Sequence, residues 1–550
     1  MTVNDGSNPL FGGNTSLADA GEQLNFTDMA RERASFFGQH PGFGRLIDTG
    51  TSTGSAITGI AAAPAARSGR VEPEPNPFLS DSFSARRTFS ASQAVLLPLL
   101  SAGLAACLWL WPHGPALAIG VFLTLVYLAI ILFRAALLSE FRGSKDPPTT
   151  NSSAASEVPQ KRYVILAALY HEAGMVPELV AALDRLQWPA ALKRVHLVCE
   201  ADDAETIAAI RAIRLPAGFH LFIAPPGRPR TKPRALNLCL AQCDGDYLVI
   251  YDAEDRPDPG QLLEAHRAFD SVPETLACLQ APLAIDNRKT NWLTGMFALE
   301  YDTLFRGILP ALAAWHAPMP LGGTSNHFKL PLLKAAGAWD AWNVTEDADL
   351  GMRLARMGYA CSTITRPTFE EAPSRFTPWL KQRTRWLKGW MQTLLVHHRD
   401  PARTLREMGA RRFALFQLML TGVVLSVLIH PVFLVTFAVT LMDIAAGGHL
   451  SSTALALLGI STFNLVGGYS TYMVLAHAVA NEIEPGRHKV FGIRLPARWR
   501  MILAFPVYWV LISLAGWRAA WQILTDPHTC GLMYQAHQIP RRKYHLGAVM

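Results

Sequence analysis

Acidic side chains directly follow one apolar run of the sequence, in a pattern that could hold a metal ion. The segment "DYLVIYDAED" ends with Asp252, Glu254 and Asp255. Adjacent carboxylates suit a hard divalent cation, Mg²⁺ or Mn²⁺, which would bridge protein oxygens and the diphosphate of a substrate. The same letters also suit an ordinary turn before "RPDPGQL", because Asp and Pro are common in turns. Taken alone, the segment supports the two interpretations about equally.

A second acidic group opens the segment "NVTEDADLGMRLARMGY", where a carboxylate could move a proton. Glu346, Asp347 and Asp349 follow Thr345, which is expected to cap a helix whose dipole favours negative charge in the first turn. A well-capped helix alone would explain this pattern. A carboxylate at this position would also have its pKa lowered by the dipole, which fits a general base that is ionised at neutral pH.

A glycine turn precedes these acids in "LPLGGTSNHF". Gly323 lets the backbone approach a ligand closely, and Thr324 and Ser325 add hydroxyl groups for hydrogen bonds. A plain turn before a strand explains the same residues. The turn is therefore a candidate binding loop only if the fold brings it to the acids.

A basic amphipathic segment, "KQRTRWLKGWMQ", follows about 35 residues later. Gln382, Arg385, Trp386 and Gly389 are expected to share one helix face. Arg can clamp phosphate oxygens, and Trp offers a flat face to a sugar ring. A juxtamembrane helix, with cations near lipid headgroups and Trp at the interface, would have the same composition.

The elements that must position these groups form an alternating pattern of strands and helices. Strands are expected at residues 162–170, 194–200, 219–225 and 246–255, with helices after Pro177, Asp203 and Pro233. This alternation predicts a mainly parallel, doubly wound α/β sheet. Ligands bind such sheets beyond the carboxyl ends of the strands. Those ends carry polar groups in three places, namely Tyr170 with Glu172, Asp202 with Asp203, and the acidic group at 252–255.

The composition indicates contact with lipid. Half of the 550 residues are hydrophobic, and the formal net charge is +7. Five apolar segments approach or exceed the ~20 residues that a helix needs to cross a bilayer. These segments are Gln93–Trp111, Pro115–Leu138, Phe413–Met442, Thr453–Val479 and Met501–Trp521.

The basic residues orient these spans. The N-terminal tail and the segment Asn481–Arg500 are rich in Arg and are expected to be cytoplasmic, which makes the central region cytoplasmic as well and places the protein in the inner membrane. Five spans would leave the basic C-terminus outside, against the same rule. The Phe413 segment, interrupted by Pro431, could instead cross partly, lie at the interface or form two short helices. The number of spans therefore stays open.

The order of these motifs resembles that of the membrane-embedded inverting family 2 glycosyltransferases, the cellulose synthase-like group of processive polysaccharide synthases. In that group an aspartate pair, a D-x-D, a T-E-D and a Q-x-x-R-W follow one another in a cytosolic domain between membrane helices. The match covers most of Lys161–Gln392 and the flanking spans. The resemblance implies a nucleotide-sugar-binding doubly wound sheet of the GT-A-like kind.

The resemblance also implies roles for individual residues. Asp347 falls on the T-E-D aspartate, implied to be the general base. Glu254 departs from the family pattern by standing where the second Asp of D-x-D is expected. The implied donor-binding residues are Tyr170, Glu172, Asp202, Asp203, Lys232, Asp252, Gln382 and Arg385; the implied metal ligands are Asp252, Glu254 and Asp255; and the implied acceptor-binding residues are Trp386, Glu346, Gly323, Thr324 and Ser325.

The implied activity is metal-dependent, inverting transfer from a UDP-sugar, first of all UDP-glucose, to a growing β-linked polysaccharide, with export through the enzyme's own helices. Mg²⁺ or Mn²⁺ would be the cofactor. The implied partners are the donor, the polysaccharide acceptor, the lipid bilayer and an accessory periplasmic or membrane subunit, with no nucleic acid. Two alternatives stay open: a single-addition glycosyltransferase acting on a lipid carrier, and a non-catalytic membrane subunit of a polysaccharide synthase.

The expected organisation therefore has five parts. They are a disordered cytoplasmic tail over residues 1–90, a two-helix transmembrane hairpin over 91–140, a cytosolic glycosyltransferase domain over 158–400, C-terminal transmembrane helices over 411–525 and a short tail over 526–550.

Overall fold

The computed structural model describes residues 76–111, 113–143, 159–271, 274–448, 451–483 and 501–527. All of them belong to one compact unit, Arg70–Met550. Several predicted features lie outside the described residues: most of the N-terminal tail, most of the basic segment 481–500, and the C-terminal tail after residue 527.

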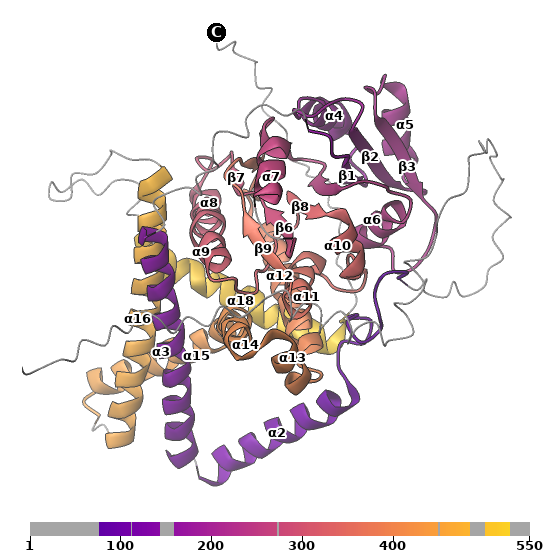
Figure 1. Cartoon of the computed structure of the whole chain (residues 1–550). Coiled ribbons are helices and arrows are strands. Elements are labelled where there is room, and N and C mark those ends of the chain that lie inside the picture. The colour runs from indigo at the N-terminus through magenta and orange to yellow at the C-terminus, as the bar shows by residue number, and fades with distance from the viewer. Residues whose placement is uncertain are drawn as a thin grey trace, which may run out of the picture. The chain divides into compact units, whose positions relative to one another are not determined.

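A seven-stranded mixed sheet forms the centre of the α/β region (Figure 1). Its strand order is β3-β2-β1-β4-β8-β6-β9, and β3, β2, β1 and β4 run parallel. The α/β prediction is therefore confirmed. The strands are β1 (Tyr163–Leu169), β2 (Lys193–Glu200), β3 (Phe219–Ala224), β4 (Tyr247–Asp252), β6 (Leu276–Gln280), β8 (Asn326–Lys329) and β9 (Ala360–Thr363).

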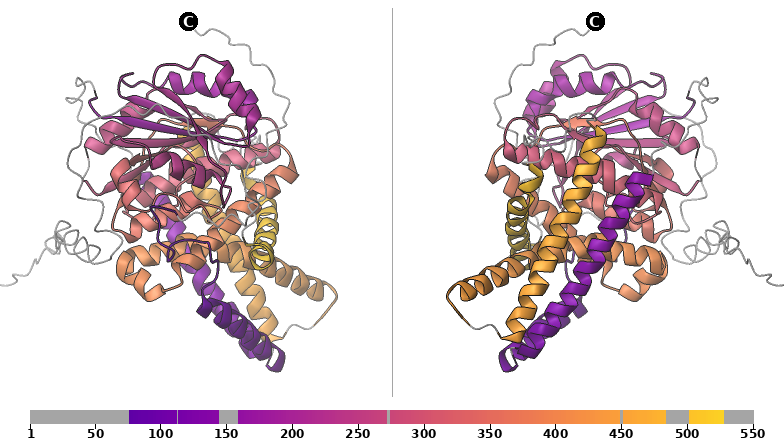
Figure 2. Two further views of the ribbon diagram at one scale, coloured as in Figure 1. Left: turned by 90° about the vertical axis from the view of Figure 1, so that its right-hand side faces the viewer. Right: turned by 90° about the vertical axis from the view of Figure 1, so that its left-hand side faces the viewer.

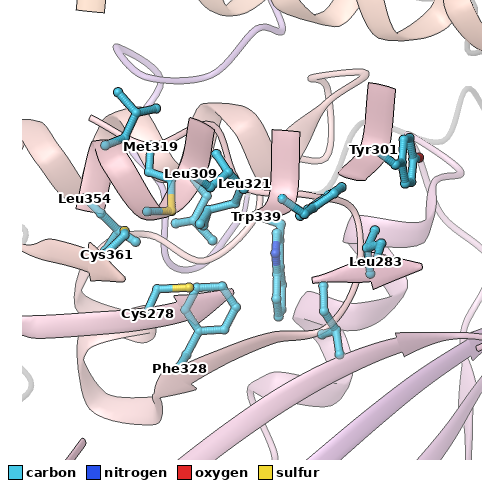
Figure 3. Close-up of a cluster of buried hydrophobic side chains, with 14 of the residues drawn as sticks. Cys278, Leu283, Tyr301, Leu309, Met319, Leu321, Phe328, Trp339, Leu354 and Cys361 are labelled. Carbon is cyan, nitrogen blue, oxygen red and sulfur yellow. The ribbon is translucent and has the colours of Figure 1, made fainter. Parts of the chain in front are cut away.

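Helices cover both faces of this sheet. Strand β1 alternates between two hydrophobic cores: Ile165 belongs to one and Leu166 to the other. Figure 3 shows part of the second core, where Phe328 of β8 meets Trp339 edge to face at 6.1 Å. The helices are η2 (Ala173–Met175), α4 (Val176–Asp184), α5 (Ala204–Ala212), α6 (Lys232–Leu240), α7 (Gln261–Asp270), α8 (Trp292–Thr303), η3 (Leu304–Ile308), α9 (Leu309–Ala314), α10 (Leu330–Ala335) and α11 (Glu346–Arg356).

A small second sheet lies beside the acidic segment. It contains β5 (Arg256–Pro257), β10 (Thr368–Glu370) and β7 (Leu283–Ile285), in the order β5-β10-β7. Because β5 begins directly after Asp255, this sheet brings the chain around residue 370 next to the end of β4.

Further helices precede and follow the α/β domain in the sequence. They are α2 (Ala91–Leu110), α3 (His113–Gly143), α12 (Phe376–His397), α13 (Pro401–Met408), α14 (Ala410–Phe416), η4 (Gln417–Thr421), α15 (Gly422–Ala445), α16 (Ser452–Ile483) and α18 (Phe505–Thr525). Helices α3 and α16 lie side by side (Figure 2), and α18 packs along α12.

Three helical segments are long and apolar enough to cross a membrane: Ala91–Leu110, Leu117–Gly143 and Ala410–Ala445. Among the described residues, α16 and α18 do not meet this measure. The expected interruption at Pro431 is wrong, because Pro431 lies inside the continuous α15. The irregularity in that segment is the π-helical turn at Gln417–Thr421.

The prediction of disorder up to residue 90 is wrong for residues 76–90, here called the N-terminal strap. Ser84 Oγ donates to Asp340 Oδ1 at 3.0 Å, and the Ala85 amide donates to Asp340 Oδ2 at 2.5 Å. Arg399 donates to the carbonyl oxygens of Ser82 and Ser84 at 3.0 and 2.9 Å. These long-range bonds bind the strap to the loop that precedes α11 and to Arg399, just after α12, and local composition does not reveal them.

Candidate active site

A cavity of about 920 Å³ opens at the carboxyl ends of β1 and β4. The polar groups that were expected at this edge meet there with groups from the glycine turn, the start of α11 and α12. The predicted residues that line the cavity are Glu172, Lys232, Asp252, Glu254, Gly323, Thr324, Glu346, Asp347, Gln382, Arg385 and Trp386. Residues from six separate segments therefore share one space.

Lys232 connects three of these segments. It begins α6, and its Nζ donates to an Asp252 carboxylate oxygen and, at 3.3 Å, to the Gly323 carbonyl oxygen. Burial opposes the charge on Lys232, but the attraction of Asp252 and Glu346 outweighs it and raises the pKa of the amine. Lys232 is therefore a positive centre among the acids, placed to meet a diphosphate.

The acidic side chains of the turn after β4 lie in two different environments. Asp252 and Glu254 line the cavity, whereas Asp255 is buried beneath it. Asp255 Oδ2 accepts hydrogen bonds from the Asp252 amide, at 2.7 Å, and from the Thr324 hydroxyl. These bonds join the turn to the glycine loop.

The same turn fits a hard cation by its chemistry. Asp255 Oδ1 is buried with no hydrogen-bond partner, and burial and the Asp252 charge raise the pKa of Asp255 well above its usual value. A divalent cation near this oxygen would remove that cost. Within the described ranges, no three His, Cys, Asp or Glu side chains are already arranged as a metal site.

Asp347 and Glu346 occupy the first turn of α11, where both are half-buried. Asp347 Oδ1 accepts from the Ala348 amide at 2.8 Å, and a Cβ at Gly323 would lie 3.3 Å from Asp347 Oδ2. The glycine turn therefore passes directly over the carboxylate. Thr345 stands at the helix N-cap, but its side chain makes no capping bond.

The expectation that the helix dipole lowers the pKa of Asp347 is wrong. Burial raises the pKa of Asp347 to about 6 and exceeds the lowering by the Ala348 amide and Lys232. Burial and the neighbouring Asp347 charge raise the pKa of Glu346 to about 8. At neutral pH, Asp347 is therefore mostly ionised and Glu346 mostly protonated. The ionised Asp347 can accept a proton.

Helix α12 supplies the opposite wall. Gln382 Oε1 and Arg385 Nε are buried atoms without a hydrogen-bond partner, as expected of groups that meet a polar ligand. The Trp386 ring lies 6.1 Å from the Tyr301 ring at an interplanar angle of 29°, and the Arg383 guanidinium lies 4.7 Å from its centroid. These two contacts fix the position of the indole ring.

Other predicted residues lie off the cavity wall, at the ends of β1 and β2. Arg230 pairs with Asp202 at 2.6 Å and covers the Tyr170 ring at 4.6 Å. Asp203 caps α5 by accepting from the Thr206 amide at 3.1 Å. The donor-binding roles of Tyr170, Asp202 and Asp203 stay predictions.

Ser325 is also buried away from the cavity, where its hydroxyl donates to Thr368 Oγ1 at 2.6 Å. Its acceptor-binding role stays a prediction.

Several further cavity residues carry no recognisable signal in the sequence. They are Tyr301, Glu370, Glu371, Arg375, Lys381 and Arg518. In "FEEAP", Glu370 ends a three-residue strand that is too short to show a period, and Glu371 follows it. Tyr301 is one of several apolar and aromatic residues on a mostly buried helix.

Two family models match the chain. The model described as glycosyl transferase family 2 matches residues 164–325, and the model described as glycosyl transferase family group 2 matches residues 247–480. Together they include the acidic turn, the glycine turn, α11 and α12. The shared domain supports the GT-A-like description of the sheet.

Curated relatives agree with these models. The chain is 26% identical to beta-monoglucosyldiacylglycerol synthase of Synechocystis over 53% of this chain and 59% of the relative. It is 25% identical to probable glucomannan 4-beta-mannosyltransferase 1 of Arabidopsis thaliana over 41% and 42%, and 24% identical to cellulose synthase 1 of Komagataeibacter xylinus over 38% and 14%. The chain thus spans less than two thirds of the length of each of these relatives.

A solved structure of mannosyltransferase PcManGT from Pyrobaculum calidifontis, in complex with GDP-Man and Mn²⁺, is also similar. The match covers 74% of this chain and 99% of that one, at 18% identity and a TM-score of 0.44.

Proposed function

Because the chain is a glycosyltransferase with a catalytic domain of the family 2 type, we propose that it transfers a sugar from a UDP-sugar, first of all UDP-glucose, to a growing β-linked polysaccharide. One observation carries this proposal: the half-buried Asp347 shares a cavity with Lys232, Asp252, Arg385 and Trp386. A base, a diphosphate clamp and a sugar-stacking face are the groups that such a transfer requires.

The chemistry follows from the groups that meet in the cavity. Lys232 and Arg385 bind the donor diphosphate and stabilise its charge as it leaves. Asp347 takes the proton of the acceptor hydroxyl, whose oxygen attacks the anomeric carbon from the face opposite the diphosphate. One displacement inverts the configuration, so an α-linked donor gives a β-linkage.

Mg²⁺ or Mn²⁺ fits the acidic turn of this site. Asp252 and Glu254 would hold the ion from the cavity side, with Asp255 behind them. The bound ion would supply positive charge to the diphosphate.

The membrane helices support export of the product as part of the proposal. Arg134 of α3 lies between Tyr472 of α16, at 5.5 Å, and Trp509 of α18, at 5.2 Å. Tyr469 bonds to His430 of α15 in the same bundle. These aromatic and polar groups would line a glycan path from an inner membrane enzyme with a cytoplasmic catalytic domain. Trp109 on α2 and Trp111 just after it are exposed.

A second candidate function keeps the enzyme class but changes the acceptor. The similarity to beta-monoglucosyldiacylglycerol synthase favours the addition of one sugar to a lipid. Product size separates the two functions, because repeated addition gives a long polymer and single addition does not. The match to glycosyltransferase domains removes the reason to keep the non-catalytic interpretation.

The test uses inverted membrane vesicles that contain the full chain, supplied with radiolabelled UDP-glucose and Mn²⁺ or Mg²⁺. We expect a long labelled polymer from the wild type and none from Asp347→Asn. A labelled lipid of one sugar unit would select the second function. Absence of incorporation from UDP-glucose and from other nucleotide sugars would refute both.

A further inference from the structure

Two glutamates that no motif predicted enter the cavity at the end of β10. Glu370 and Glu371 both line it. The backbone that carries them is fixed on both sides: the Asp286 amide donates to the Glu370 carbonyl at 3.0 Å, and the Asn287 side chain bonds both the amide and the carbonyl of Ala372, at 2.9 and 2.8 Å. The segment is therefore positioned before any ligand binds.

The Glu370 carboxylate lies between the acidic turn and the aromatic end of the cavity. It is hydrogen-bonded to the Tyr301 hydroxyl, and the Tyr301 ring stacks on Trp386. Strand β10, which ends at Glu370, pairs with β5, which begins directly after Asp255, so Glu370 also lies near the acidic turn. Glu370 thus occupies the junction of the donor and acceptor halves.

This combination of groups has a specific use in sugar recognition. A flat indole covers the C–H face of a pyranose ring, and an adjacent carboxyl group binds the hydroxyls at the edge of that ring. Either protonation state of a carboxyl group can hydrogen-bond a hydroxyl. The Tyr301 hydroxyl uses one hydrogen-bonding position of the Glu370 carboxyl group, which has further positions for a ligand in the cavity that it lines.

We propose that Glu370, held in place by Tyr301, is a specificity-determining residue that binds a hydroxyl of the acceptor sugar stacked on Trp386. This inference rests on the proposed function, since it names the chemistry of the acceptor as a glycosyl unit with a free hydroxyl at that edge. In this proposal Glu370 binds the acceptor sugar, whereas Asp252 and Glu254 hold the metal ion. Tyr301 is a positioning residue.

The test measures binding and does not need turnover. A β-linked gluco-oligosaccharide and its monodeoxy analogues are titrated onto the detergent-solubilised full chain in the presence of UDP and Mn²⁺. In the wild type, we expect one deoxy analogue to bind about tenfold more weakly than the parent sugar, as for one lost hydrogen bond to a carboxyl group. In Glu370→Ala that difference should vanish, because the hydroxyl has lost its partner.

Further variants test the role of Tyr301 and serve as controls. Tyr301→Phe keeps the ring and removes the hydroxyl, so the deoxy difference should shrink without loss of stacking. Glu371→Gln is the matched control, since it changes the neighbouring carboxylate in the same cavity, and the difference should persist. Glu370→Leu, which keeps most of the side-chain volume but has no hydrogen-bonding atom, replaces the alanine variant if the latter does not fold.

Three results would overturn the inference. One is a deoxy penalty that survives in Glu370→Ala. Another is a weakening of Mn²⁺ binding by about tenfold or more in Glu370→Gln with the penalty intact, which would make Glu370 a metal ligand. The third is an absence of oligosaccharide binding to the wild type. A wild type that binds the sugar with a Glu370-dependent penalty but transfers no glucose would refute only the proposed function.

Discussion

Gly389 of α12 lies so close to Thr345 that no side chain fits between the two residues. A Cβ at position 389 would be 2.4 Å from Thr345 Oγ1 and 2.6 Å from the Thr345 backbone nitrogen. The helix that carries Arg385 and Trp386 is thereby seated directly on the loop that carries Asp347. The distance between the base and the diphosphate clamp depends on this contact.

Substitution of Gly389 by Ala should therefore impair catalysis. The new methyl group forces α12 away from Thr345, because the backbone nitrogen cannot move aside as a flexible side chain would. We expect kcat to fall by about tenfold or more, since small displacements of reacting groups are costly. The same substitution at Gly459 of α16 is the control and should leave kcat unchanged, because a methyl group added there would meet no atom within 4 Å. Equal rates for the two variants would contradict the prediction.

The pH dependence of kcat should reflect the ionisation of Asp347. A base with a pKa of about 6 is ionised at neutral pH and takes up a proton as the pH falls. The value of kcat should therefore decrease about tenfold per pH unit below about pH 6. Glu346→Gln should retain most of the rate at pH 7, because Glu346, with a pKa of about 8, is already protonated there. If kcat fell only below about pH 4, another group would be the base.

Replacing Asp347 by Asn should stabilise the fold at neutral pH. The pKa of Asp347 is raised from 3.8 to about 6 in the folded protein, so the folded state loses this proton less readily than the unfolded state. Ionised Asp347 therefore lowers the free energy of unfolding, a cost that grows between about pH 4 and 6 and is fully present above pH 6. Thermal unfolding should show Asp347→Asn more stable than the wild type at pH 8, by about 2 to 3 kcal/mol, and equally stable near pH 3. A lower midpoint at pH 8 would count against a buried, costly charge.

The carboxylates of the acidic turn should respond differently to mutation. Asp252→Asn and Glu254→Gln should raise the Mn²⁺ concentration needed for half-maximal activity by about tenfold or more. Asp255→Ala should lower the thermal midpoint as well, because it removes the oxygen that accepts from the Asp252 amide and the Thr324 hydroxyl. Chelation by EDTA should abolish activity, and added Mn²⁺ or Mg²⁺ should restore it. Full activity in EDTA would exclude the proposed metal.

The N-terminal strap should contribute to stability. Asp340→Ala removes acceptors for the Ser84 hydroxyl, the Ala85 amide and the Trp342 amide, and we expect a loss of about 1 to 3 kcal/mol. Asp81→Ala changes an exposed acid on the same strap and is the control. Thermal unfolding of both variants in detergent measures the difference, and a matched midpoint would show that the strap is not held by Asp340.

Local patterns were sufficient to predict most of the sheet and the outline of the site. Strand β4 and the acidic turn could be predicted because an apolar run followed by polar residues is a pattern of consecutive residues. The same holds for the helix from Glu346, whose acids and apolar residues repeat at helical spacing. The ends of parallel strands share one edge, so the meeting of their polar residues followed from topology.

Features that depend on tertiary packing could not be predicted in the same way. The helix dipole at Asp347 is local, but the burial that raises its pKa comes from the glycine turn and α12. Glu370 and Tyr301 are 69 positions apart by their numbers, and nothing in either segment indicates that they pair. The strap looked disordered for the same reason, because its partners lie far along the chain.

The strap also constrains the order in which the molecule can assemble. Ser84 is synthesised 256 residues before Asp340, its hydrogen-bonding partner, and two helices long enough to cross a membrane come between them. Translation runs from the N-terminus, and domains fold as they emerge. When the loop before α11 leaves the ribosome, the strap has therefore already been synthesised. Completion of that loop depends on a segment that lies on the far side of two long apolar helices, so the fold of the catalytic loop is tied to the placement of those helices.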